Sequence, residues 1–179
     1  MVDLCLRSIV AFLLTEGAWD NAQGWASLTA DERNTTKAAY NDAGIALMVS
    51  AFGSSDTPTS SGTDPTDTAN TMAAWVIQYG LDGIDVDYEV SLLRAYIYVC
   101  SAKTNTLGQD FNAFDSGTAE AWLITFTQAL RAKLPASDYI ITHARSYPHS
   151  STVCQIDVAH IIQLSPPGFP PRCGLVVDT

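Results

Sequence analysis

The sequence predicts an α/β protein with a parallel sheet, because short apolar runs alternate with amphipathic segments of helical spacing. The runs contain few polar residues, which is typical of strands that are buried on both faces. The 179 residues are 47% hydrophobic and 16% charged, so they can form one globular domain with a core. The net charge of −10 argues against a nucleic-acid partner, and no apolar run is long enough to predict a membrane span.

The expected elements alternate from the N-terminus onward. Buried strands are expected at residues 9–14, 45–52, 81–89 and 139–144. A loop over 15–20 follows the first strand, and a helix over 27–44 comes after that loop. Thr29 and Glu32 would form a capping box near the start of this helix, and Gly44 would end it.

The two later helices carry boundary signals of their own. One is expected to begin at Pro65 with Asp64 as its N-cap, and apolar residues then recur at the spacing of one helix face. The other places Trp122 and Phe126 on an apolar stripe and is stopped by Pro135. Each helix would therefore connect two neighbouring strands of the parallel sheet.

The third expected strand carries a run of carboxylates, Asp-Gly-Ile-Asp-Val-Asp-Tyr-Glu at 82–89. Strand alternation would put Asp85, Asp87 and Glu89 on one face, about 6–7 Å from neighbour to neighbour. Like charges this close should raise the proton affinity of at least one carboxyl group. We interpret the run as a carboxyl cluster for acid–base chemistry. A site for a hard cation and an acidic strand end at the surface are the alternatives.

This run fits the pattern D-x-x-D-x-D-x-E and resembles the signature of glycoside hydrolase family 18, the chitinases and related endo-β-N-acetylglucosaminidases. Segments similar to fungal members of the family are FLLTEGAWD at 12–20, MVSAFGSSDTPTS at 48–60, NTMAAWVIQY at 70–79, FNAFD at 111–115 and AWLITFT at 121–127. The resemblance covers roughly residues 9–89 and 110–144. It implies a (β/α)8 TIM barrel with its active site at the C-terminal strand ends. This chain would be an incomplete barrel that holds roughly strands two to five and the intervening helices.

The resemblance also implies a retaining mechanism in which the 2-acetamido group of the substrate is the nucleophile. Glu89 would act as general acid and then as general base. Asp87 would orient the acetamido group, and Asp85 would share a proton with Asp87. The partner would be a polysaccharide or oligosaccharide that contains N-acetylglucosamine, and no cofactor or metal is expected.

Other matched positions are expected to support the carboxylates or to contact the substrate. Structural roles are expected for Asp82, Gly83 and Gly53. Contacts to the substrate are expected for Glu16, Trp19 and Ser50. Packing in the core is the alternative for Trp19.

The family has a small-residue motif, S-x-G-G, on its third strand. Here the motif reads Ser50-Ala51-Phe52-Gly53, so Phe52 stands in place of one glycine. Tyr88 lies next to the carboxylates in sequence, and alternation would point its ring away from them. We therefore expect a packing role for Tyr88.

Two segments depart from the family pattern. The family typically continues after its signature with Asp-Phe-Asn, which stands here at 110–112, so residues 90–109 interrupt the match. Val90-Ser91 can be encoded as a splice donor and Gln109 as an acceptor, and we interpret the segment as a retained intron. A genuine insertion loop is the alternative. Residues 145–179 are interpreted as a non-homologous, out-of-frame tail.

The predicted function is hydrolysis of β-1,4 bonds in N-acetylglucosamine polymers such as chitin. The alternatives are a non-catalytic carbohydrate-binding relative and an inactive fragment from a mis-spliced gene model. The presence of Glu89 favours the enzyme. No signal peptide is recognised, but the glycosylation sequon Asn34-Thr35-Thr36 and the family resemblance predict an extracellular parent protein.

Overall fold

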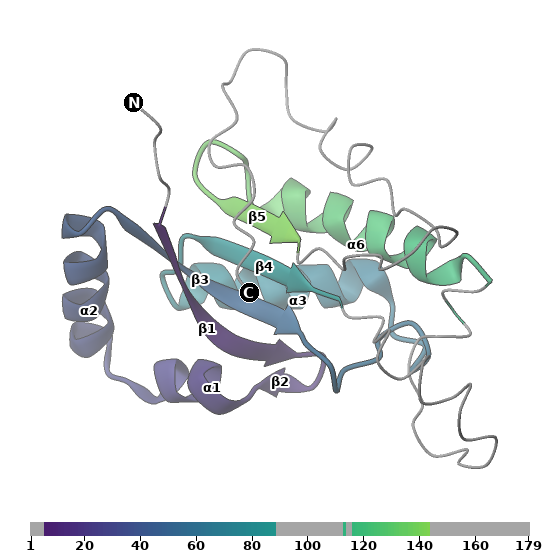
Figure 1. Cartoon of the computed structure of the whole chain (residues 1–179), viewed down its shortest axis with the longest axis horizontal. Helices are drawn as coiled ribbons and strands as arrows, with labels where there is room; N and C mark the ends of the chain where they lie inside the picture. Colours follow the sequence, from purple (N-terminus) through teal and green to yellow (C-terminus); the bar gives the residue numbers. More distant parts are fainter. Residues whose placement is uncertain (1–5, 89–112, 114–115, 144–179) are drawn as a thin grey trace, which may run out of the picture.

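A five-stranded sheet forms the centre of the computed structural model, which describes residues 6–88, 113 and 116–143 (Figure 1). The elements in chain order are β1 (Leu6–Leu14), β2 (Gly17–Ala18), α1 (Asp20–Ser27), α2 (Ala30–Asp42), β3 (Ile45–Phe52), α3 (Pro65–Gln78), β4 (Gly83–Asp87), α6 (Thr118–Lys133) and β5 (Ile140–His143). The strand order is β2-β1-β3-β4-β5, in which only β2 is antiparallel to its neighbour. The expected mixed α/β fold with a parallel sheet is confirmed, whereas a closed barrel stays a prediction.

All the expected strands are present, and they differ from the expectation only at their ends. β3 has the expected bounds, β1 begins earlier and β5 is one residue shorter at each end. β4 is shorter than the expected strand over 81–89. Its ladder with β3 finishes where Phe52 pairs with Asp87, and the Gly53 N–H then donates to the Asp87 carbonyl at 2.9 Å.

The segment before α2 contradicts the expectation of a loop over 15–20 followed by one helix over 27–44. β2 and α1 occupy this segment, and α2 begins only at Ala30. Trp19, the N-cap of α1, makes no side-chain hydrogen bond to the helix, so the sequence carries no start signal there. α2 has the expected capping box, in which the backbone N–H of Thr29 donates to the Glu32 carboxylate at 2.8 Å.

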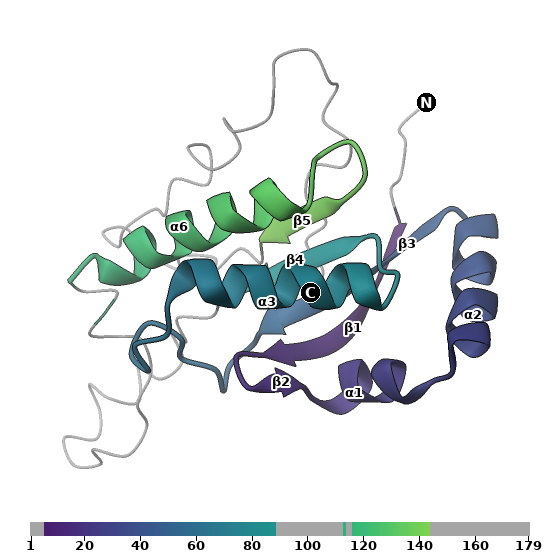
Figure 2. The same ribbon diagram turned by 180° about the vertical axis from the view of Figure 1, so that it is seen from behind.

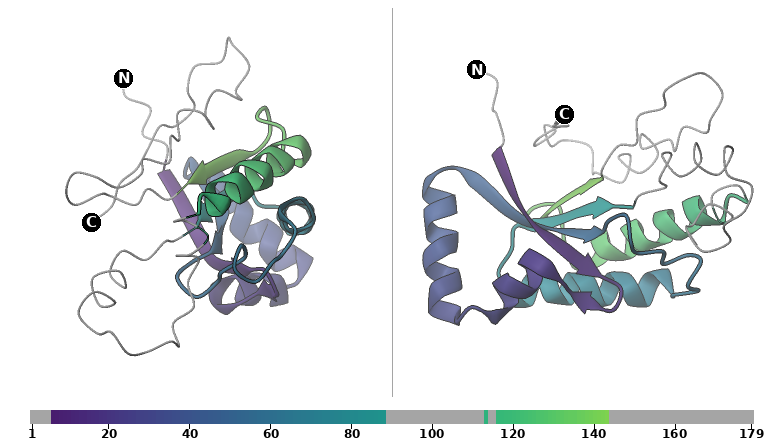
Figure 3. Two further views of the ribbon diagram at one scale, coloured as in Figure 1. Left: turned by 90° about the vertical axis from the view of Figure 1, so that its right-hand side faces the viewer. Right: turned by 60° about the horizontal axis from the view of Figure 1, so that its bottom comes forward.

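α3 and α6 lie side by side on one face of the sheet (Figures 2 and 3). α3 begins as expected, with Pro65 in its first turn and the Asp64 carboxylate accepting the Asp67 N–H at 2.8 Å. α1 packs against β1, and α2 packs against β3. None of the helices in the described ranges is long and apolar enough to cross a membrane.

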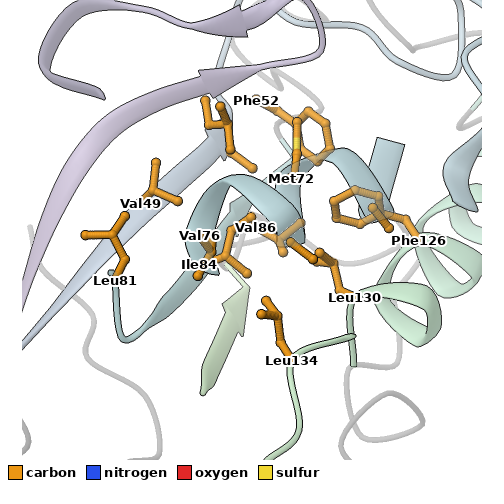
Figure 4. Close-up of a cluster of buried hydrophobic side chains, with 14 of the residues drawn as sticks. Val49, Phe52, Met72, Val76, Leu81, Ile84, Val86, Phe126, Leu130 and Leu134 are labelled. Atoms are coloured by element: carbon orange, nitrogen blue, oxygen red, sulfur yellow. The ribbon is translucent and has the colours of Figure 1, made fainter. Parts of the chain in front are cut away.

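The core lies between the sheet and the two helices α3 and α6 (Figure 4). β3 and β4 contribute alternate residues, such as Val49, Ile84 and Val86, which are at most 1% exposed. The helices contribute Met72, Val76, Phe126 and Leu130. Burial of one such side chain is worth roughly 1.5–3 kcal/mol, so this face of the sheet is firmly held. The opposite face of β4 is the one that carries its polar residues.

Candidate active site

The carboxylates of β4 lie on the face of the sheet that α3 and α6 do not cover. Ile84 and Val86 are buried in the core, so strand alternation puts Asp85 and Asp87 on the opposite face, where both are half-buried. The burial pattern of β4 therefore follows the alternation expected from the sequence. Asp87 is the last residue of β4, and ligands of parallel α/β sheets bind beyond the carboxyl ends of strands.

Asp85 stands between two hydroxyl-bearing residues of the neighbouring strands. In the parallel ladders, Asp85 pairs with Ser50 of β3 and with Thr142 of β5. The Thr142 hydroxyl donates a hydrogen bond to Oδ1 of Asp85. Ser50, an expected substrate contact, is buried, with 4% of its surface exposed. Thr142 could not be identified from the sequence, because its pairing with Asp85 depends on a strand register that no local pattern encodes.

Asp82 lies at the opposite end of β4 from Asp87 and joins three elements. Its carboxylate accepts the Leu47 N–H of β3 at 2.7 Å and lies 2.5 Å from Nζ of Lys37 on α2. Its backbone carbonyl accepts the Ile140 N–H of β5 at 2.8 Å. These contacts explain how an acidic residue can directly precede a strand whose neighbours are largely buried.

Two glycines of the expected site lie where another chain segment leaves no room for a side chain. A Cβ at Gly83 would lie 2.0 Å from the backbone carbonyl oxygen of Ile140 on β5. Gly53 has a φ of +75°, and a Cβ there would lie 2.9 Å from Cε1 of Phe12. Because the Gly53 N–H also donates to the Asp87 carbonyl, Gly53 sets the path of the chain beside the carboxylates.

Phe52, which replaces a motif glycine, keeps a left-handed backbone with a φ of +75°. This conformation breaks the alternation of β3, and the Phe52 ring lies in the core, 5.1 Å from the centroid of Phe126. Tyr88 stacks on Trp122 with centroids 6.0 Å apart, and its hydroxyl lies 2.8 Å from that of Thr59. The expected packing role of Tyr88 agrees with these contacts.

The other two expected substrate contacts are Glu16, in the turn between β1 and β2, and Trp19, which lies between β2 and α1. Both side chains are exposed, and Trp19 is 62% exposed, so the alternative of core packing for Trp19 is wrong. The backbones of Trp19 and Phe12 exchange two hydrogen bonds, at 2.9 and 3.2 Å. The Asp56 carboxylate accepts both the backbone N–H and the hydroxyl of Thr15, which ties this turn to the loop that follows β3.

His143 follows Thr142 on β5 and lies near the helix that covers this edge of the sheet. Its Nε2 is 3.4 Å from the hydroxyl of Thr127 on α6. Burial lowers the pKa of His143 from 6.5 to about 4, against the negative charge of Asp85, which raises it. The positive charge of Arg131 lowers the pKa further. His143 is therefore neutral at neutral pH.

Several expectations fall on residues outside the described ranges. Glu89, the expected general acid, is one of them, and the segments 90–109 and 145–179 are the others. Among the residues that the structure describes, no three His, Cys, Asp or Glu side chains gather as they would to hold a metal ion. The described part of the site thus consists of Asp85 and Asp87, their supporting contacts and the exposed side chains of Glu16 and Trp19.

A solved structure similar to this chain is that of a GH18 chitinase from Pseudoalteromonas aurantia. The two are 26% identical, with a TM-score of 0.53 over 78% of this chain. The match covers 47% of the chitinase chain, so this chain spans about half the length of that structure. No protein-family model and no curated protein matched the chain. These comparisons support a fold similar to part of that chitinase.

Proposed function

We propose that this chain is part of a glycoside hydrolase family 18 enzyme that cleaves β-1,4 bonds between N-acetylglucosamine units of chitin. The observation that carries the proposal is the position of Asp85 and Asp87. They share the uncovered face of β4, which ends at Asp87, and they precede Glu89 in the D-x-x-D-x-D-x-E run. The likeness to a chitinase supports the proposal. In this proposal β1, β3, β4 and β5 are strands two to five of a (β/α)8 barrel.

The proposed reaction proceeds through an intermediate formed within the substrate. Glu89 protonates the glycosidic oxygen while the acetamido oxygen of the substrate attacks its own anomeric carbon. The C–O bond to the leaving sugar breaks, and a cyclic oxazolinium ion forms. Asp87 orients the acetamido group and stabilises this cation by its negative charge. Glu89 then removes a proton from water, which opens the ring and restores the original anomeric configuration.

Glu16, in the turn between β1 and β2, and Trp19, directly after β2, supply the proposed sugar contacts. The exposed ring of Trp19 offers an apolar face on which a sugar ring can stack, and the exposed carboxylate of Glu16 can accept hydrogen bonds from sugar hydroxyls. Ser50 would act from within the sheet, next to Asp85 in the ladder. Because Asp56 holds the turn at Thr15, these contacts would be made by a backbone that is already ordered.

Hydrolysis of a chitooligosaccharide tests the proposal. The full chain and a chain without residues 90–109 are each compared with their Glu89→Gln variants. We expect the variant to lose at least about a hundredfold in rate, the usual contribution of a general acid. Activity that survives Glu89→Gln would contradict the mechanism. Binding of the oligosaccharide without hydrolysis by either chain would favour a non-catalytic carbohydrate-binding protein instead.

Sequencing of mature transcripts tests the interpretation of residues 90–109. If the segment is a retained intron, spliced transcripts join the codons of Glu89 and Asp110, and the protein made from them is the active form. If every mature transcript keeps the segment, it is a genuine insertion, and the hydrolysis experiment then rests on the full chain alone.

A further inference from the structure

The hydroxyl of Thr142 donates a hydrogen bond to Asp85 on the carboxylate face of β4. The family resemblance assigned no role to Thr142. We propose that Thr142 is a positioning residue for Asp85. Its hydroxyl occupies Oδ1 of Asp85, so that Oδ2 is the oxygen that carries the proton shared with Asp87. This inference rests on the proposed function, because the shared proton belongs to the proposed mechanism.

The backbone holds the two side chains in this relation. Asp85 and Thr142 are paired in the ladder of two parallel strands, so their Cα atoms are fixed by the hydrogen bonds of the sheet. Both residues are half-buried, where a bond to a carboxylate is stronger than in water. A threonine in a strand also has a restricted χ1 angle, so little further order is needed to aim its hydroxyl.

The chemistry follows from the single proton of a hydroxyl. Thr142 donates that proton to Oδ1. In a protonated carboxyl group, the carbonyl oxygen accepts a hydrogen bond more strongly than the oxygen that carries the proton. The acidic proton of Asp85 is thus directed to Oδ2. Without the hydroxyl, Asp85 could place its proton on either oxygen and would hold that proton more strongly, because a donor to the charged form is lost.

Other charged groups near Asp85 do not supply this bond. Asp87 has the same charge sign and lies on the same strand face. Asp82 is at the far end of β4, where Lys37 and Leu47 hold its carboxylate. His143, whose pKa is about 4, carries no charge at neutral pH. In the part of the chain that the structure describes, the donor to Asp85 is the hydroxyl of Thr142.

The experiment compares variants of the full chain that differ in this hydroxyl. Thr142→Val removes the hydroxyl and keeps the branched shape, Thr142→Ala removes it without adding bulk, and Thr142→Ser retains it. Thr125→Val is the matched control, because the hydroxyl of Thr125 is exposed on α6 and donates only to the Ala121 carbonyl at 3.0 Å. Circular dichroism establishes that each variant folds.

Two measurements are made on each variant. The first is the carbon-13 signal of the Asp85 side-chain carboxyl as a function of pH, which does not depend on activity. We expect Thr142→Val and Thr142→Ala to move the titration of this signal upward by about one pH unit, the size of a hydrogen bond to a charged group. Thr142→Ser and Thr125→Val should leave it in place.

The second measurement is the pH dependence of chitooligosaccharide hydrolysis. We expect Thr142→Val to lower kcat about tenfold, to move the acid limb of the profile upward and to leave KM nearly unchanged. Thr142→Ser should keep kcat and the acid limb of the profile close to those of the unmodified chain. An Asp85 signal that titrates alike in all variants would overturn the inference, even if the chain is active. An unmodified chain without activity would count against the proposed function, while the carboxyl titration would still decide the role of Thr142.

Discussion

Gly83 shows how a single residue determines the distance between two strands of the site. The β4 and β5 backbones approach so closely that a Cβ at Gly83 would overlap the carbonyl oxygen of Ile140. The backbone cannot yield as the end of a flexible side chain could. Because β4 and β5 also carry Asp85 and Thr142, a shift at Gly83 would separate the partners of that hydrogen bond.

We therefore expect Gly83→Ala to lower the free energy of unfolding by about 3 kcal/mol, the upper part of the range for overpacking. The matched control is Gly24→Ala, since Gly24 lies in α1 with nothing within 4 Å of an added Cβ. That variant should gain up to about 1 kcal/mol from helix propensity. Urea unfolding measures both. Equal stability of the two variants would mean that β5 can move away from β4 at little cost.

Residue roles that depend on one strand could be predicted from the sequence, and those that depend on two could not. Alternation within β4 is local, so it correctly separates Asp85 and Asp87 from the buried Ile84 and Val86. The bond from Thr142 to Asp85 depends on the register of β5 against β4, which only the assembled sheet defines.

At the scale of elements, Asp82 connects a helix to the sheet. Lys37 is on α2, Leu47 is on β3, and both contact the carboxylate at the start of β4. The Leu47 N–H donates to this carboxylate, so an apolar residue at 82 would remove its acceptor. α2 itself contributes no buried residue, which makes this contact important for its attachment.

We expect Asp82→Ala to destabilise the protein by about 2 kcal/mol, because it removes the acceptor for Leu47 and the ion pair together. Asp82→Asn keeps an acceptor oxygen and should cost less than half as much. Lys37→Met removes the ion pair alone and should cost at most about 1 kcal/mol. Thermal unfolding of the three variants separates the terms. If Asp82→Asn is as unstable as Asp82→Ala, the ion pair is the main contribution.

Helices were predicted correctly where a capping side chain marks their start. α2 and α3 begin after side chains that accept backbone N–H groups, Thr29 and Asp64, and both caps were identifiable. α1 begins after Trp19, whose side chain caps nothing, and was missed. Phe52 shows a second limit, because its left-handed backbone is imposed by the path of the chain into Gly53 and not by the residue itself.

At the scale of the whole molecule, the four parallel strands follow one another in the sheet in the order in which they occur in the chain. β1, β3, β4 and β5 are successive parallel neighbours, and α3 and α6 cover a single face. A sheet built in this way can continue in the same direction, and closure around its uncovered face would put the carboxylates of β4 on the inner side. This topology agrees with a likeness that covers 47% of a chitinase chain.

We expect the free energy of unfolding to fall at acidic pH because of His143. The pKa of this side chain is about 4 in the folded protein and about 6.5 when it is exposed on unfolding. Between these values the unfolded chain binds a proton that the folded chain does not, so folding weakens as the pH falls. The stabilisation is complete above pH about 6.5 and is lost as the pH falls toward about 4. The slope contributed by one such group approaches about 1.4 kcal/mol per pH unit.

Urea unfolding is measured at pH about 7.5, 6, 5 and 4.5, which covers most of the range between the two pKa values. The unmodified chain is compared with His143→Gln. Carboxyl groups titrate in the same range in both proteins, so the difference between the two curves isolates the histidine. We expect the unmodified chain to lose more stability between pH about 6.5 and about 4.5 than His143→Gln does, because glutamine has no proton to gain. Parallel curves would mean that His143 binds its proton equally well in the folded and the unfolded protein. Burial on β5 would then not lower its pKa.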